Sequence, residues 1–171
     1  MIIEYNGKRP TIADDVFIAP SAVIIGDVII EEKANIWFGV VLRGDEGQII
    51  IGSRASIQDN AVVHVNPRHK TIVEADATIG HSVVLEGCHI KSGALIGMNA
   101  TVLDGAIIGE RALIAAGSVV REFQEIPPEM LAAGVPAQVK GPMSDEARNQ
   151  VLAASADYQH MANNYKHLKS I

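Results

Sequence analysis

Cysteine and aromatic residues are scarce in this sequence, and each shortage limits what the protein can be. Cys88 is the only cysteine among 171 residues, so the chain cannot form an internal disulfide, which suits a reducing compartment such as the cytoplasm. Aromatic side chains make up 4% of the residues. A core made almost entirely of aliphatic residues and alanine has to be narrow and regular, because no large rings are available to fill irregular space.

Long apolar runs and an excess of positive charge are absent as well. The chain has no stretch of about 18 consecutive apolar residues that would span a bilayer. The opening MIIEYNGKRP lacks the charged start and the apolar run of a signal peptide. The formal net charge of −6 argues against a nucleic-acid-binding surface. We therefore expect a cytoplasmic protein that binds neither a membrane nor nucleic acid.

Large aliphatic residues recur every six positions through most of the chain. The pattern is interrupted only by steps of nine, ten and five residues between its four groups. The eighteen positions are Ile12, Ile18, Ile24, Ile30, Ile36, Leu42; Ile51, Ile57, Val63; Val73, Ile79, Leu85; Ile90, Ile96, Val102, Ile108, Ile114 and Val120. A period of six is neither helical nor a simple strand alternation. It is the signature of a parallel β-helix built from hexapeptides.

Each hexapeptide of such a β-helix makes one short strand and one corner. The large aliphatic side chain points into the prism, and the residue four positions later, usually alanine or another small or β-branched residue here, fits at the corner. Since three hexapeptides complete a turn, eighteen of them predict about six turns. We expect an all-β domain over residues 1–143, ending in an extended tail at EIPPEMLAAGVPAQVKGP, where prolines exclude a helix.

The last part of the chain, residues 144–171, is typical of an α-helix packed on or beside the β-helix. Ser144 suits the N-cap, and Asp145 and Glu146 suit the first turn. The predicted helix is about 24 residues long by its three- and four-residue apolar spacing. Its apolar stripe consists of Val151, Ala154, Tyr158, Met161, Tyr165 and Leu168.

Three polar residues are predicted to form a column on the outside of the prism. Assigning the aliphatic positions to three faces in rotation puts Leu42, Val63 and Leu85 on one face. The next residue along a strand points outward, so Arg43, His64 and Glu86 lie on successive turns about 4.8 Å apart. Ligand atoms around a tetrahedral metal ion lie roughly 3.4 Å from one another, so neighbouring turns can share an ion.

His81 occupies a different place in the repeat. It follows Ile79 by two residues, which puts it on the next face or at the corner leading to the column, poorly aimed at a metal held by His64 and Glu86 of its own chain. A second prism packed alongside brings its own His81 to that column. If the three side chains share one metal ion, the spacing predicts a homotrimer with one site at each interface.

Five stretches together carry a resemblance to a known family. They are NIWFGVVLRGD, IGSRASIQDNAVVH, IGHSVVLEGC, GALIGMNATVLDGAIIG and LAAGVPA, and they span nearly the whole chain. They resemble the gamma-class carbonic anhydrases, trimers of left-handed β-helices with a metal at each subunit interface. The resemblance implies a left-handed coil, against the usual right-handed crossover rule. It also implies reversible hydration of carbon dioxide to bicarbonate by a metal-bound hydroxide.

The resemblance also assigns metal ligands. In the family three histidines hold a divalent metal, most often zinc, with iron or cobalt as alternatives. The first two match His64 and His81, but the third position holds Glu86 here. Glutamate is an accepted zinc ligand. Two histidines and a carboxylate leave the site with less positive charge than three histidines, so bound water is acidified less and carbon dioxide hydration is expected to be weak or absent.

Catalytic roles follow from the same resemblance. Gln58 resembles a residue that hydrogen-bonds metal-bound water. Arg43 and Asp59 resemble a pair that bridges neighbouring subunits, and Asp45 completes the Arg-Gly-Asp turn. The long acidic loop that archaeal members use for proton transfer has no counterpart, since only VNPRHKT separates His64 from the next strand.

Several alternatives stay open at this point. Glu86 is a metal ligand, or it lies beside a two-histidine or metal-free site, or it is a solvated charge. His89 is a less favoured substitute ligand, and His69 is interpreted as a surface loop residue. The rival functions are coenzyme A-dependent acyl transfer, which shares the hexapeptide repeat, and a trimeric binding or scaffold protein without a reaction.

Overall fold

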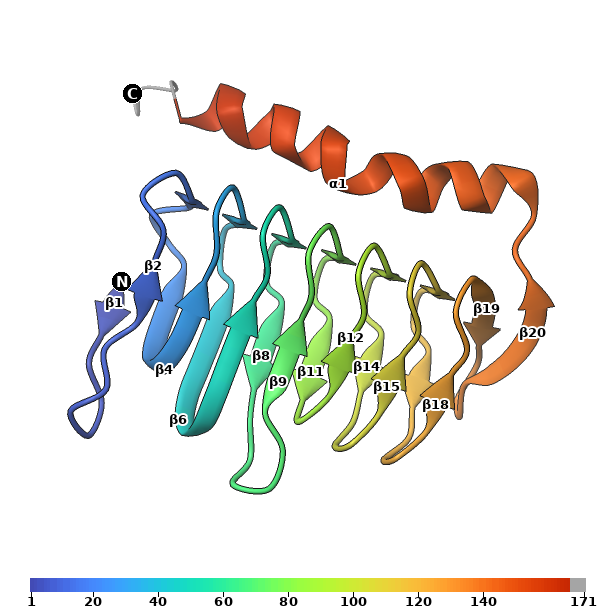
Figure 1. Ribbon diagram of the computed structural model, residues 1–171, viewed down its shortest axis with the longest axis horizontal. Coiled ribbons are helices and arrows are strands. Elements are labelled where there is room, and N and C mark those ends of the chain that lie inside the picture. The colour runs from blue at the N-terminus through green and yellow to red at the C-terminus, as the bar shows by residue number, and fades with distance from the viewer. Residues whose placement is uncertain (167–171) are drawn as a thin grey trace.

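The six-residue repeat folds into a parallel β-helix. In the computed structural model, which describes residues 1–166, the chain makes about seven turns. It rises on the near side in Figure 1, crosses at the top and descends on the far side while advancing from left to right, so the coil is left-handed. The predicted all-β fold class is confirmed. The estimate of six turns is too low, because the inward pattern continues beyond Val120 through Ile126 and Ala132.

Three columns of strands form the faces of the prism, and each column is named here. The helix face consists of β3 (Phe17–Ile18), β5 (Asn35–Ile36), β7 (Ser56–Ile57), β10 (Thr78–Ile79), β13 (Leu95–Ile96), β16 (Leu113–Ile114) and β19 (Met130–Ala133). Antiparallel β20 (Gln138–Pro142) pairs with β19 and ends this column.

The other two faces are joined by long strands that run around a corner. The His64 face consists of β1 (Ile2–Ile3), the first part of β4 (Val23–Ile30) and of β6 (Val41–Ile51), β8 (Val62–His64), β11 (Val84–Glu86), β14 (Thr101–Val102) and β17 (Val119–Val120). The third face consists of β2 (Thr11–Ile12), the rest of β4 and β6, β9 (Thr71–Val73), β12 (His89–Ile90), β15 (Ile107–Ile108) and β18 (Glu125–Ile126).

The core lies along the axis of the prism. From Ile24 to Val120, every large aliphatic residue of the repeat is at most 1% exposed. Burying such a side chain contributes about 1.5–3 kcal/mol, so the stacked aliphatic residues supply the main driving force for folding. Most corners place the third residue after the aliphatic position at a positive φ, as at Asn60 (60°) and Gly93 (66°).

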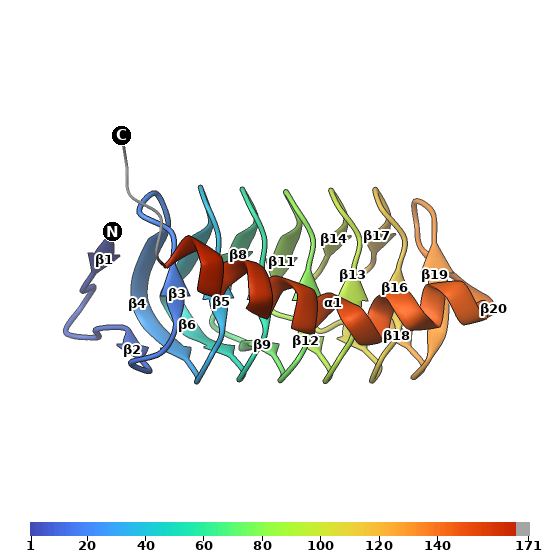
Figure 2. The same ribbon diagram turned by 90° about the horizontal axis from the view of Figure 1, so that it is seen from above.

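Helix α1 (Asp145–Tyr165) runs back along the helix face, from the last turns to the first (Figures 1 and 2). Its predicted N-cap is confirmed, because the Ser144 side chain accepts a hydrogen bond from the Ala147 N–H at 3.2 Å. The helix has 21 residues. The predicted stripe position Leu168 lies outside the described residues.

The face by which α1 contacts the prism overlaps the predicted apolar stripe only in part, since Val151 is buried and Tyr158 packs against the core. The buried helix residues are Val151, Ser155 and Ala162, whereas Met161 is 36% exposed. Small Ser155 and Ala162 let the helix approach the flat strands closely, so they join the contact although the apolar spacing did not include them.

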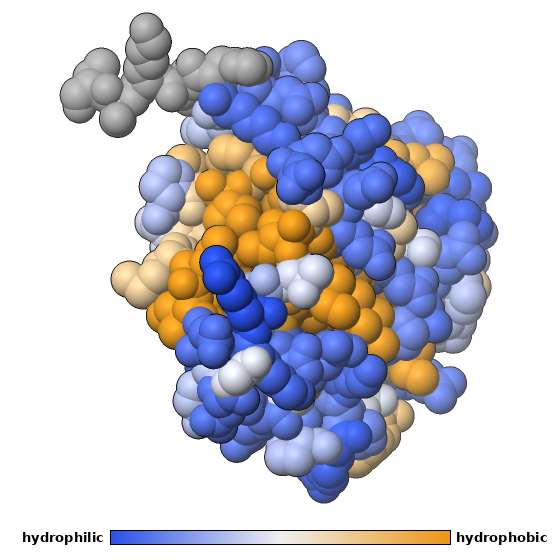
Figure 3. Space-filling view, turned by 60° about the vertical axis from the view of Figure 1, so that its left-hand side comes forward, coloured by the Kyte–Doolittle hydropathy of each residue, from blue (hydrophilic) through white to orange (hydrophobic). Residues whose placement is uncertain are grey.

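The N-terminal end of the prism presents apolar side chains to the surface (Figure 3). Met1 and Ile2 are exposed there, and Ile12 and Ile18 of the first turn are only partly buried. Within residues 1–166, β1, β2 and β3 each pair with one neighbouring strand, so they form the edge of the β-helix at this end. Within residues 1–166, no helix combines the length and the apolar character needed to cross a membrane.

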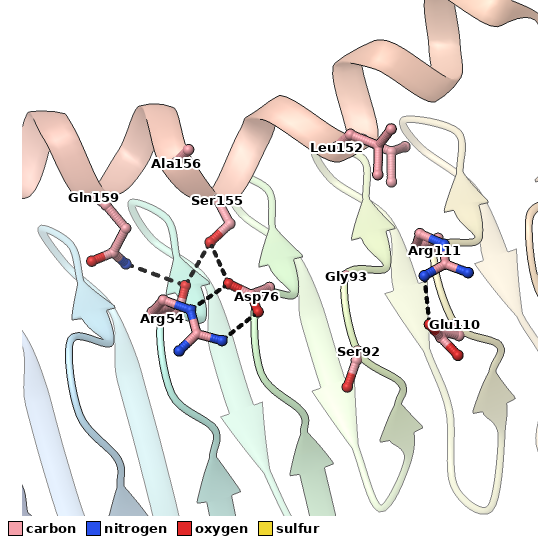
Figure 4. A pocket seen from close by; sticks show the side chains of 11 residues that line it. Arg54, Asp76, Ser92, Gly93, Glu110, Arg111, Leu152, Ser155, Ala156 and Gln159 are labelled. Atoms are coloured by element: carbon pink, nitrogen blue, oxygen red, sulfur yellow. Dashed lines mark hydrogen bonds and ion pairs between the residues drawn. The ribbon is translucent and has the colours of Figure 1, made fainter.

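Polar contacts fix one side of α1 to the corners of the prism. Arg54 and Asp76, on neighbouring turns, form a two-point ion pair with distances of 2.7 and 2.6 Å. The Ser155 hydroxyl donates to the Arg54 carbonyl at 2.9 Å, and Gln159 donates to the same oxygen (Figure 4). These groups line a cavity of about 570 Å³, but their charges already pair with one another.

Aromatic residues fix the other end of α1. Five of the seven aromatic side chains, Phe17, Trp37, Phe38, Tyr158 and Tyr165, form one cluster with ring centroids 5.1 to 6.5 Å apart. Trp37 lies at its centre and donates its indole N–H to the Asn35 side chain at 2.7 Å. The scarce aromatic residues are therefore used for docking the helix and not for filling the prism.

Candidate metal centre

Arg43, His64 and Glu86 lie on neighbouring rungs of the His64 face, as the six-residue period predicts. Arg43 of β6 is opposite His64 of β8, and His64 is opposite Glu86 of β11. His64 Nδ1 lies 3.8 Å from Glu86 Oε1. The His64 side chain is 18% exposed and that of Glu86 is 43% exposed, so the pair faces outward from the prism wall.

Asp45 orients the other side of the His64 ring. Its Oδ1 lies 3.1 Å from His64 Nε2, and its Oδ2 accepts a hydrogen bond from Arg43 at 2.5 Å. Burial favours the neutral carboxyl group, but the hydrogen bonds from Arg43 and His64 outweigh it and hold the pKa of Asp45 below its usual value. Asp45 is therefore a charged acceptor that can hold a proton on Nε2 and leave the Nδ1 lone pair facing Glu86.

His81 lies at the corner between the helix face and the His64 face. Its Nδ1 is 2.9 Å from Asp59 Oδ2, and its Nε2 is 3.3 Å from the hydroxyl of Tyr158 on α1. Burial, with a smaller effect of the Asp59 charge, raises the pKa of Tyr158, so its hydroxyl stays protonated at neutral pH. Sequence reasoning treated Tyr158 only as a packing residue, since helical spacing gives no sign of a contact with a residue 77 positions away.

The three proposed ligands do not meet within one chain. In the part of the chain that the structure describes, no group of three or more His, Cys, Asp or Glu side chains is placed to hold a metal ion. His64 and Glu86 form a pair, and His81 is directed to Asp59 and Tyr158 instead. This arrangement agrees with the expectation that His81 is poorly aimed at the pair of its own chain.

Gln58 is close to His81 and is only 5% exposed. Both residues line a cavity of about 490 Å³ between α1 and the adjoining corner of the prism, together with Tyr158. Leu95, Met98 and the main chain of Gly97 supply much of its remaining wall. A few polar groups in a largely apolar cavity are typical of a small-molecule site.

Comparisons with known proteins agree with this architecture. The family model described as bacterial transferase hexapeptide (six repeats) matches residues 9–44 and 87–122. A carbonic anhydrase of Geobacillus kaustophilus is 41% identical over 169 residues, which cover 99% of this chain and 93% of that protein. A probable carbonic anhydrase of Methanocaldococcus jannaschii is 49% identical over 79% of this chain and 85% of its own length.

The chain belongs to the gamma carbonic anhydrase-like family. Its fold is also that of a Bacillus cereus protein named as a candidate acetyltransferase, with a TM-score of 0.96, 44% identity and 98% of both chains covered. Family membership therefore implies a divalent metal, while the choice between hydration and acyl transfer depends on the site itself.

The donors of His64 and Glu86 in this family member fit two positions around a divalent metal ion. Two donors of a tetrahedral ion are separated by roughly 3.4 Å, close to the 3.8 Å between His64 Nδ1 and Glu86 Oε1. Each histidine also has one ring nitrogen held by a carboxylate, Asp45 or Asp59, which is the usual support of a metal-ligating imidazole. Among residues 1–166, no third His, Cys, Asp or Glu side chain joins the pair to complete a metal site.

The remaining candidates are directed elsewhere. His89 Nε2 lies 2.6 Å from Glu74 on the third face, and His69 Nδ1 lies 2.9 Å from Asp104, so neither contacts the pair. Cys88 lies in the core of the prism, away from the outward-facing pair, and burial raises the pKa of its thiol to about 12.

Proposed function

We propose that this protein is a homotrimer that holds a divalent metal ion, zinc before iron or cobalt, at each interface and hydrates carbon dioxide reversibly at a reduced rate. The observation that carries the proposal is the outward-facing pair of His64 and Glu86, 3.8 Å apart, with His81 positioned at a corner of the same prism. The single buried cysteine supports a reducing, cytoplasmic setting.

The surface around the pair supports a contact between copies. Val62 and Val84 on the same face are 37% and 40% exposed, and they lie opposite each other on neighbouring rungs two positions before His64 and Glu86. Exposed apolar side chains beside an incomplete set of metal ligands favour a second copy of the chain as the partner that covers them and supplies the third ligand. Three-fold repetition of that contact closes into a ring with three sites.

The residues of this chain have separate tasks in the proposed reaction. A bound divalent metal supplies the acidity that turns water into a nucleophile near neutral pH. Asp45 and Asp59 each hold one ring nitrogen of a histidine and fix which nitrogen is free to ligate. The Gln58 amide orients the attacking water, and the apolar wall of its cavity admits carbon dioxide. Arg43 keeps Asp45 charged.

Replacing Glu86 tests the proposal. Glu86→His restores three neutral ligands and removes one negative charge, so carbon dioxide hydration followed by stopped-flow with a pH indicator should rise by about tenfold or more. Zinc content of protein purified without added metal should be near one ion per chain and should drop in His64→Ala. If the wild-type protein is purified without metal and also binds no zinc on dialysis, the proposal is contradicted. The hypothesis of a scaffold protein without a reaction would then remain.

Acyl transfer is the second candidate, because the Bacillus cereus protein of the same fold is named as a candidate acetyltransferase. In that reading a histidine such as His81, held by Asp59, activates an acceptor hydroxyl toward an acyl thioester. Release of free thiol from acetyl-coenzyme A in the presence of simple acceptors, lost in His81→Asn, would favour it over hydration.

A further inference from the structure

The chain leaves the prism next to the candidate metal centre and returns at a buried threonine. Strand β8 ends at His64, residues 65–70 form a loop, and β9 begins at Thr71. The fully buried Thr71 hydroxyl donates to the carbonyl of His64 at 2.5 Å and accepts from the N–H of Gly87 at 2.8 Å. Since Gly87 directly follows Glu86, one hydroxyl joins the main chains that carry both members of the ligand pair.

The loop also clamps the turn at Gly87 from its other side. Gly87 has φ of 59°, and a Cβ there would lie 2.1 Å from Asp104 Oδ1 and 2.9 Å from Asn66 Nδ2. The nearly buried Asp104 accepts hydrogen bonds from Asn66 at 2.5 Å and pairs with His69 at 2.9 Å. Asn66 Oδ1 in turn accepts from the main-chain N–H groups of Arg68 and His69. The turn is therefore enclosed between the loop and β14.

Regular strand pairing does not continue past the ligand pair. Strands β8 and β11 are in register as far as His64 and Glu86, and both end there. Beyond that point the Thr71 hydroxyl takes the place of the main-chain ladder. A carbonyl and an N–H buried at this position would otherwise lose their hydrogen bonds, at a cost of about 1–3 kcal/mol each.

We propose that Thr71 is a positioning residue for the metal centre, with the loop of residues 65–70 as its support. Its hydroxyl sets the separation of the His64 and Glu86 strand ends, and thereby the distance between the two donor atoms. The inference rests on the proposed function, because it takes His64 and Glu86 as ligands. Groups that hold metal ligands in place are worth about 10–100-fold in metal affinity.

Thr71→Val is the direct test, because it keeps the shape of the side chain and removes the hydroxyl. We expect its affinity for Zn²⁺, measured by competition with a chromophoric chelator, to fall about 10–100-fold below wild type. Thr71→Ser keeps the hydroxyl and should restore the affinity. Ser56→Ala is the control, since the Ser56 hydroxyl is also fully buried on a strand, has no hydrogen-bond partner within residues 1–166, and lies outside the cavity of Gln58 and His81.

Two further measurements separate the possible failures. Hydrogen exchange of the Gly87 amide in metal-free protein should accelerate at least tenfold in Thr71→Val, which reports the lost hydrogen bond without any metal. Should Thr71→Val not fold, Asn66→Ala loosens the same loop from outside the core and should lower Zn²⁺ affinity in the same direction. Wild-type affinity in Thr71→Val overturns the positioning role alone, whereas a wild-type protein that binds no Zn²⁺ overturns the proposed function and this role with it.

Discussion

Asp45 and Asp59 hold two different histidines in the same way. Each carboxylate contacts one ring nitrogen, at 3.1 Å for His64 and 2.9 Å for His81, and so selects the other nitrogen as the acceptor; in His81 that nitrogen, Nε2, faces the Tyr158 hydroxyl. The neutral imidazole has one donor and one acceptor nitrogen, and the carboxylate decides which is which. Metal affinity should therefore depend on two residues that need not touch the metal.

Asp59→Asn tests this dependence at His81. The amide can present its N–H₂ to the ring as well as its oxygen, so the ring is no longer held in one tautomer, and we expect a loss of about tenfold or more in Zn²⁺ affinity. A titration against a chromophoric chelator measures it. Asp14→Asn is the control, because Asp14 is exposed and forms no ion pair or side-chain hydrogen bond among the described residues. Equal affinities in both variants would contradict the role of Asp59.

The charge of Glu74 stabilises the fold against acid. Burial favours its neutral form, but hydrogen bonds from Ser92, Lys91 and His89 outweigh this and lower its pKa to about 2, from 4.5. Because the unfolded chain takes up the proton first, Glu74 stabilises the fold above about pH 4.5, and this contribution is lost as the pH falls toward about 2.

The pH dependence of unfolding checks this sign. Glu74→Gln should lower the free energy of urea unfolding at pH 7, and its difference from wild type should shrink as the pH is lowered from about 4.5 toward 2. A difference that stays constant over this interval, or grows, would show that the Glu74 charge is not the cause.

At the scale of elements, the docking of α1 depends on one aromatic cluster and one polar anchor. Trp37 is 4% exposed and contacts four other rings, two of which, Tyr158 and Tyr165, belong to the helix. Tyr158 also contacts His81. The position of α1 therefore affects the orientation of His81, a proposed metal ligand.

Trp37→Ala should loosen that end of α1. We expect a loss of about 3–5 kcal/mol in the free energy of unfolding, as for other buried Trp-to-Ala changes, and faster amide exchange in the second half of the helix. Phe123→Ala is the control, since Phe123 is 60% exposed and lies outside the cluster, and its effect should stay within about 0.5 kcal/mol. Undiminished protection of the helix amides in Trp37→Ala would contradict the docking role.

Periodic elements were predictable from the sequence, and their contacts across the fold were not. The column of Arg43, His64 and Glu86 follows from the six-residue period of the aliphatic positions, because the repeat sets the register between neighbouring turns of a β-helix. The contact of Tyr158 with His81 depends on how the helix docks, and the hydrogen bonds of Thr71 depend on a loop that interrupts the period.

The residue types at the corners also carry information about the fold, which the six-residue aliphatic period alone does not use. The third residue after each aliphatic position takes a positive φ at most corners, and these positions are rich in Gly and Asn, the residues that adopt this conformation at the least cost. The docking face of α1 was harder to predict, because small Ser155 and Ala162 are buried while larger Met161 is not.

At the scale of the whole molecule, a shared metal centre makes assembly and metal binding one property. An outward stripe runs along the His64 face through Val23, Val41, Val62, Val84 and Val119, with Thr101 between the last two. Its two ends lie away from the ligand pair, so they can be changed without placing a charge beside it. Light scattering of the wild type should give three times the chain mass of 18.2 kDa.

Val23→Arg combined with Val119→Arg should separate the copies. Each arginine would place a charge without a partner in the proposed contact between copies, where water is excluded, and this disfavours association, while both side chains are partly exposed in the single prism and leave its core intact. Mass and zinc content should fall together, because each centre needs His81 from a second copy. Val139→Glu, on exposed β20, should change neither. Full zinc content in a folded monomer would show that one chain supplies all the ligands of the metal centre. It would then contradict the proposal that the centre requires a trimer.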